Sequence, residues 1–109
     1  MPKKMLVLLL ALMLLQVVGC APAPVLLEVG KEATVKEPSY MANDEVNGKR
    51  MVELLRAEND PVLAKLMFDK VLDGIEEGAK VMVVSQQDML VKVDYNGQEI
   101  YLWANSLKQ

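Results

Sequence analysis

Residues 90–103 read Leu90-Val91-Lys92-Val93-Asp94-Tyr95-Asn96-Gly97-Gln98-Glu99-Ile100-Tyr101-Leu102-Trp103, two alternating stretches around an Asn-Gly pair. Alternation of apolar with polar residues predicts two half-buried strands. Asn-Gly favours a two-residue type I′ turn, because both central residues of that turn need a positive φ. The segment therefore predicts a β-hairpin, and this hairpin is the element that decides the fold.

The two-residue turn also fixes the register of the hairpin. One face would carry the pairs Tyr95–Gln98, Val93–Ile100 and Val91–Leu102, and the other face Asp94–Glu99, Lys92–Tyr101 and Leu90–Trp103. We expect the first face to line the core. On the second face, Leu90, Tyr101 and Trp103 form a candidate binding surface, with two arrangements open: burial beneath neighbouring helices, or an exposed aromatic strip.

The middle of the chain predicts two short helices. We interpret Asn47-Gly48 as a turn, followed by strong helix formers over residues 49–58. Asn59-Asp60-Pro61 would end this helix and start a second one over residues 61–70, with Asp60 as its N-cap and Pro61 at the first helical position. Together they predict a helical insert at about residues 48–70.

Extended segments are expected on both sides of these helices. Residues 25–37 predict one or two strands with a break at Gly30-Lys31, and Pro38 ends the stretch. Glu76-Glu77-Gly78 predicts a turn, and residues 80–84 alternate like a strand. The fold class is therefore mainly β with a helical insert (α+β), in a single small domain over residues 25–109.

The N-terminal stretch differs from the rest of the chain. Residues 5–18 carry no charge and follow Lys3 and Lys4, an arrangement typical of a secretory signal peptide. The apolar run is short for a bilayer core of roughly 30 Å. A buried core helix is the alternative, although such a helix would be apolar on every face.

Val17-Val18-Gly19-Cys20 resembles the lipobox of bacterial lipoproteins. The resemblance implies a signal-peptide helix over residues 1–19, cleavage between Gly19 and Cys20, acylation of Cys20 with diacylglycerol and fatty acid, and a short Pro-rich tether over residues 20–24. Ala21 after the cysteine implies an outer-membrane location facing the periplasm, provided that the source has an outer membrane. The alternative is an ordinary signal peptide that leaves a free thiol, which is unfavourable in an oxidising compartment.

A second resemblance covers the C-terminal region. Gly78-Ala79-Lys80-Val81-Met82-Val83-Val84, the hairpin quoted above and Ser106-Leu107 look like the C-terminal half of a bacterial SH3-like domain. The resemblance implies a five-stranded SH3-like barrel, here with the two helices inserted after the first strand. The family's early loop has no counterpart in this sequence, so no binding residues are carried over from it.

Composition limits the chemistry open to the chain. It contains no His and one Cys, which excludes Ser-His-Asp and Cys-His catalysis and the usual zinc ligand sets. Because two of the twelve Lys and Arg residues are Lys3 and Lys4, residues 20–109 carry ten basic against fifteen acidic side chains, a net charge of −5. This acidity argues against nucleic-acid binding. We expect no metal and no cofactor; the Asp94–Glu99 pair is interpreted as solvated.

These features predict a non-enzymatic envelope lipoprotein, anchored to the lipid bilayer through Cys20, that acts as a binding or scaffolding module for a protein complex or for peptidoglycan. Fold analogy alone suggests peptidoglycan, which is weak support for function. An inhibitor, immunity or exclusion-type lipoprotein that blocks an incoming enzyme or conjugation system fits the same small size and anchor. An enzyme that uses carboxylates alone is the third alternative.

Overall fold

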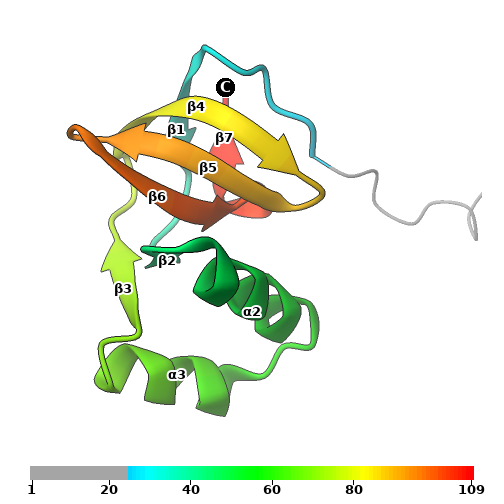
Figure 1. Cartoon of the computed structure of the whole chain (residues 1–109), viewed down its shortest axis with the longest axis vertical. Coiled ribbons are helices and arrows are strands. Elements are labelled where there is room, and N and C mark those ends of the chain that lie inside the picture. Colours follow the sequence, from blue (N-terminus) through cyan, green and yellow to red (C-terminus); the bar gives the residue numbers. More distant parts are fainter. Residues whose placement is uncertain (1–24) are drawn as a thin grey trace, which may run out of the picture.

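The computed structural model describes residues 25–109, which form a mainly β domain with two helices (Figure 1). In chain order the elements are β1 Glu32–Val35, β2 Ser39–Ala42, α2 Glu45–Arg56, α3 Asp60–Phe68, β3 Leu72–Ile75, β4 Lys80–Gln87, β5 Leu90–Tyr95, β6 Gln98–Trp103, the 3-10 turn η1 Ala104–Ser106, and β7 Leu107–Lys108. Within residues 25–109, neither helix has the length and apolar character needed to cross a membrane.

The predicted hairpin is confirmed in turn and in register. Asn96 and Gly97 both have positive φ, 54° and 84°, as a type I′ turn requires. The Asp94 carboxylate accepts a hydrogen bond of 2.9 Å from the Gly97 amide and so braces the turn. All six predicted pairs are present, from Tyr95–Gln98 at the turn to Leu90–Trp103 at the open end.

The strands form one antiparallel sheet in the order β3-β2-β6-β5-β4-β1-β7, which curls around a core as a half-barrel. The register of β4 against β5 shifts between Val83 and Ser85, an irregularity that increases the bend of a strand. On the predicted core face of the hairpin no side chain is more than 1% exposed among Val91, Val93, Ile100 and Leu102. The short strands β1 and β7 cover the other side of the same core.

Helix α2 begins earlier than the sequence predicts, and Asn47-Gly48 is not a turn. Asp44 is the N-cap: its carboxylate accepts a hydrogen bond of 2.8 Å from the Asn47 amide and another of 3.1 Å from the Asn47 side chain. Asn47 and Gly48 therefore lie in the first turns of the helix. Helix packing outweighs the turn preference of this dipeptide, and a Cβ at Gly48 would crowd the sheet.

The start of α3 is also one residue away from the prediction. Asn59, not Asp60, is the N-cap, and its side chain accepts a hydrogen bond from the Val62 amide at 3.4 Å. Asp60 is the first helical residue and Pro61 the second. The N–H that proline lacks would have no partner there, because the helix has no carbonyl four residues earlier. The two helices thus cover residues 45–68, and the short ribbon β2–β3 joins their outer ends to the sheet.

The segment ahead of β1 is held by two glutamine side chains. The Gln86 amide donates to the Val25 carbonyl at 2.7 Å and accepts from the Leu27 amide at 3.0 Å. The Gln109 side-chain amide binds the backbone of Glu28 in the same way. It accepts a hydrogen bond of 2.7 Å from the Glu28 N–H and donates one of 2.9 Å to the Glu28 C=O. Each side chain thus pairs with a backbone C=O and a backbone N–H of the segment, as a neighbouring strand would. Residues 25–28 are therefore fixed to the domain although they are not a strand.

Candidate binding surface

Two of the predicted site residues, Gly19 and Cys20, lie outside residues 25–109, which the structure describes. The signal peptide and the tether over residues 20–24 lie outside the described part as well. Lipidation at Cys20 therefore remains a prediction from the sequence. The rest of the candidate site, Leu90, Tyr101 and Trp103, falls on strands β5 and β6.

The sheet brings Leu90, Tyr101 and Trp103 together on the outer face of the hairpin, where α2 covers them. Leu90 and Trp103 are cross-strand partners, and Tyr101 pairs with Lys92. Leu90 is 7% exposed, while Tyr101 and Trp103 are half-buried against the core cluster. The sequence left two arrangements open, burial and exposure. Leu90 is buried beneath a helix, and the two aromatic rings are intermediate, with part of each ring in solvent.

Gly48 makes this close cover possible. A Cβ atom at Gly48 would lie 2.9 Å from Leu90 Cδ1 and 3.1 Å from Tyr101 Cβ. Both distances are shorter than ordinary carbon–carbon contacts of about 3.5–4.0 Å. The absence of a side chain therefore lets the first turns of α2 sit directly on β5 and β6. The Trp103 indole Nε1 is buried and has no hydrogen-bond partner among the described residues, so packing alone holds this ring.

A groove of about 480 Å³ opens beside the covered residues, between α2 and the turn that joins β4 to β5. Its apolar lining comes from three core side chains, Val52, Met89 and Leu90, each no more than 8% exposed. Its polar lining is Lys49, Glu53, Arg56, Gln87 and Asp88. A second hollow of about 80 Å³ shares Gln87 and Leu90 with it and continues toward Lys92 and Tyr101.

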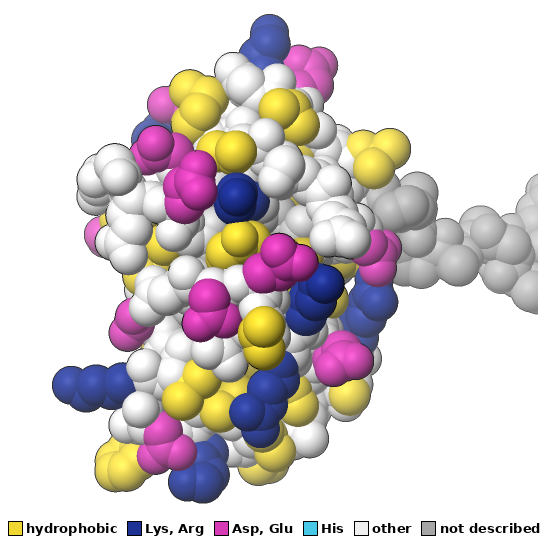
Figure 2. Space-filling view, in the orientation of Figure 1, with side chains coloured by type: hydrophobic (Ala, Val, Ile, Leu, Met, Phe, Trp, Pro, Cys, Tyr) yellow, Lys and Arg dark blue, Asp and Glu magenta, His cyan; other side chains and the backbone are white. Residues whose placement is uncertain are grey.

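Ion pairs surround the groove and the adjoining sheet. Arg56 of α2 reaches across to Asp88 in the β4–β5 turn at 2.8 Å, and Lys49 pairs with Glu45 at 3.0 Å. On the sheet, Lys92 lies 3.5 Å from Glu99 and 6.0 Å from the centre of the Tyr101 ring. The ammonium group thus offsets the repulsion between the cross-strand carboxylates of Asp94 and Glu99. In Figure 2 positive and negative side chains are interspersed across the viewed face.

This arrangement suits noncovalent contact with another molecule. The apolar residues offer a small surface for an apolar group, and the surrounding ion pairs and Gln87 offer hydrogen bonds of both kinds. Within residues 25–109 no three potential metal-ligating side chains among His, Cys, Asp and Glu gather in one place. The carboxylates that line the groove, Glu53 and Asp88, are exposed to solvent.

The sequence pointed to Leu90 but missed the α2 side of the groove. One signal was available: Asp44 three residues before Asn47 fits an N-cap, and a helix starting there puts Gly48, Val52 and Arg56 on one face at intervals of four.

The fold and surface define a small curled-sheet domain with a helix-covered groove. No protein-family model, curated protein or solved structure matches this chain.

Proposed function

We propose that the chain is the precursor of an envelope lipoprotein, anchored through acylated Cys20, whose domain is a non-enzymatic binding module. The observation that carries the proposal is the order of segments. A basic stub, an uncharged apolar run and Val17-Val18-Gly19-Cys20 end five residues before Val25, the first residue of the described domain. A lipid anchor immediately ahead of a small domain would hold that domain at a membrane surface.

The finer fold assignment belongs to the same proposal. A five-stranded SH3-like barrel would use β1, β4, β5, β6 and β7, and the segment from β2 to β3, with both helices, would be the insert after the first strand. The pairing of β7 with β1 and of β1 with β4 supports this, because it brings the two ends of the chain into one sheet with the central meander. An experimental structure with these five strands arranged otherwise would contradict it.

The partner would be an envelope protein that docks at the groove between α2 and the β4–β5 turn. The apolar lining of Val52, Met89 and Leu90 beside paired charges supports a protein contact, since interfaces combine an apolar centre with a polar rim. Peptidoglycan is the other partner that the resemblance to SH3-like domains suggests. The inhibitor or immunity role would use the same surface, and no described residue favours it over scaffolding.

Anchoring is tested by labelling cells that express the full chain with radioactive palmitate. We expect label in the processed protein, which should be in the membrane fraction, and loss of both label and processing in Cys20→Ala, which should accumulate as the precursor. A Cys20→Ala chain that is still processed and still sediments with the membrane would refute anchoring through this residue.

Binding is tested in the same cells with a photo-crosslinking amino acid at Glu53 on the groove, and at Lys65 on the exposed side of α3 as the matched control. The proposal expects a protein adduct from position 53 that position 65 does not give. Two results together would contradict a protein partner and favour peptidoglycan. Position 53 would give no protein adduct, and the full chain would co-sediment with purified sacculi whether or not it carries Glu53→Arg.

A further inference from the structure

The segment that leads into the domain presents apolar side chains to solvent. Leu26 is 80% exposed and Val29 60%, while Val25 and Leu27 pack against the core. The outward direction of Leu26 is fixed, because Gln86 binds the backbone of both its neighbours. Single exposed apolar residues are common on protein surfaces, so the exposure of Leu26 and Val29 gains meaning only from where the segment lies.

The position of this segment indicates what the partner is. Cys20 precedes Val25 by five residues, and five residues span at most about 17 Å even when fully extended. The Gln86 side chain that binds Val25 also donates to the Asp88 carbonyl at 2.9 Å, so the fixed part of the chain starts at the β4–β5 turn. An acylated Cys20 would therefore keep this corner of the domain close to the bilayer at all times.

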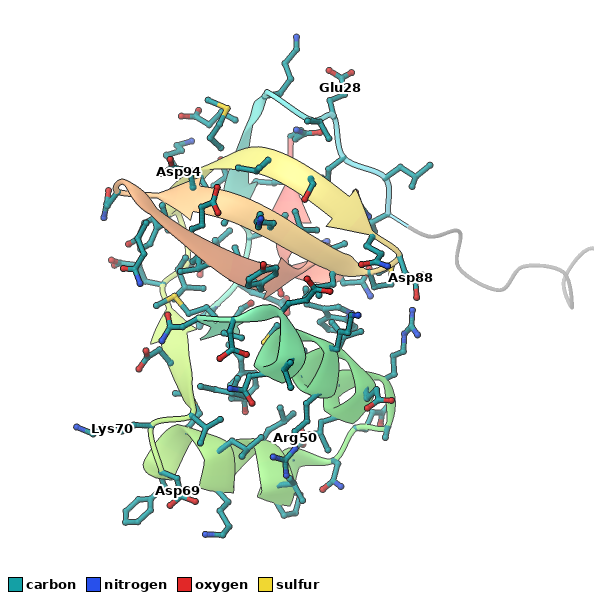
Figure 3. The ribbon with its side chains drawn as sticks, viewed as in Figure 1. Glu28, Arg50, Asp69, Lys70, Asp88 and Asp94 are labelled. Atoms are coloured by element: carbon teal, nitrogen blue, oxygen red, sulfur yellow. The ribbon has the colours of Figure 1, made fainter. Side chains whose placement is uncertain are left out.

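Two of the carboxylates at this corner have cations beside them. Glu28 has Lys31 at 3.8 Å, and Asp88 has Arg56 at 2.8 Å. This pairing reduces the repulsion of these two carboxylates from an anionic membrane surface. Figure 3 shows Glu28 and Asp88 on the side of the molecule where the described chain begins, with Asp69 and Lys70 at the opposite end.

We propose that the exposed side chains of Leu26 and Val29 contact the bilayer, and that the domain rests on its own membrane through them. The inference depends on the anchoring proposed above and adds an orientation to it. Residues 25–29 face the lipid, and α3, whose Phe68 is 85% exposed, faces away from it. The partner of these side chains is the phospholipid surface itself, because a tether of at most about 17 Å keeps them next to it.

The test compares two exposed apolar positions in the full chain, Leu26→Cys and Phe68→Cys. Acylation consumes the native thiol of Cys20, so each variant carries one reactive cysteine. The measurement is the rate of labelling by a water-soluble maleimide in isolated membranes. The same two substitutions in a chain that starts at Ala21, and so lacks both the apolar run and the acylated cysteine, give the rates in solution without an anchor. Val46→Cys, at a residue 76% exposed on α2, is a second control.

With the anchor, we expect position 26 to react about tenfold more slowly than position 68, equivalent to a covered state favoured by about 1.4 kcal/mol. Without the anchor, the two rates should agree within about twofold, because both side chains are similarly exposed. Equal rates in a chain that does incorporate palmitate would overturn the bilayer contact and leave the anchoring intact. Failure to incorporate palmitate would overturn both proposals.

Discussion

Gly48 of α2 lies against Tyr101 of β6 so closely that a Cβ on the glycine would stand 3.1 Å from the Tyr101 Cβ. This contact joins the helical insert to the hairpin and determines how much of Leu90, Tyr101 and Trp103 solvent can reach. The same helix lines the groove together with the β4–β5 turn. The proposed binding surface therefore depends on the glycine.

Replacing Gly48 with Ala tests this packing. Alanine favours a helix over glycine by about 1 kcal/mol, but overpacking a tight contact costs about 1–3 kcal/mol. Because Tyr101 Cβ belongs to the strand and cannot swing away, we expect overpacking to dominate and Gly48→Ala to lower the free energy of unfolding by about 1 kcal/mol. Urea denaturation measures this free energy of unfolding. Gly74→Ala is the control, since its Cβ would meet its first neighbour, Met67 Cε, at an ordinary 3.5 Å.

Replacing Gln86 with Glu tests the attachment of residues 25–28. The carboxylate keeps the size of the side chain but cannot donate to the Val25 and Asp88 carbonyls, which then face an acceptor. We expect the Leu27 amide to exchange with solvent about tenfold faster and stability to fall by about 1–3 kcal/mol. Hydrogen exchange followed by NMR gives the rate. Gln87→Glu, at the exposed neighbouring position, should leave the Leu27 amide protected.

Gly97→Ala tests the hairpin turn. The φ of 84° at Gly97 is in the left-handed region, where a Cβ costs about 1–2 kcal/mol. The free energy of unfolding should fall by that amount, and Gly97→Asn should recover a substantial part of it because asparagine tolerates this conformation. Thermal or urea unfolding of the three chains distinguishes them. Equal stability of the alanine and asparagine variants would contradict the turn assignment.

The ion pair between Arg56 and Asp88 should contribute little to stability. Its side chains are 50% and 66% exposed, and pairs in solvent are worth about 0–1 kcal/mol. In a double-mutant cycle with Arg56→Gln and Asp88→Asn, we expect a coupling energy below about 0.5 kcal/mol that decreases further at high salt. Asparagine is chosen because Asp88 has a φ of 58°, which asparagine also adopts. A coupling well above 1 kcal/mol would show that the pair is shielded from solvent.

Local patterns in the sequence predicted the hairpin, because a two-residue turn allows only one register between its two strands. Once Asn96 and Gly97 occupy the turn, the alternation of Val91 and Val93 with Lys92 and Asp94 decides which face is buried. The two helices were also expected, since strong helix formers dominate both segments. The predicted starts of both helices were wrong. The N-cap of α2 is Asp44, a few residues before the turn signal at Asn47-Gly48, and the N-cap of α3 is Asn59, one residue before Asp60.

The candidate site could be predicted only in part. The register placed Leu90, Tyr101 and Trp103 on one face, but the choice between exposure and burial depended on where α2 lies, 34 or more residues away in sequence. Strand β2 was missed for the same reason, and β3 was indicated only by the two-residue period that begins at Val71. Each has four residues, and they form a ribbon because the helical insert brings them together.

The sequence by itself determined the hairpin, the class of the domain and the absence of histidine, because turn chemistry, alternation and composition are local properties of the chain. Tertiary structure alone decided the groove, the cover over the aromatic residues and the attachment of residues 25–28 by Gln86 and Gln109. These features arise from contacts between residues far apart in sequence, for which the chain carries no local signal.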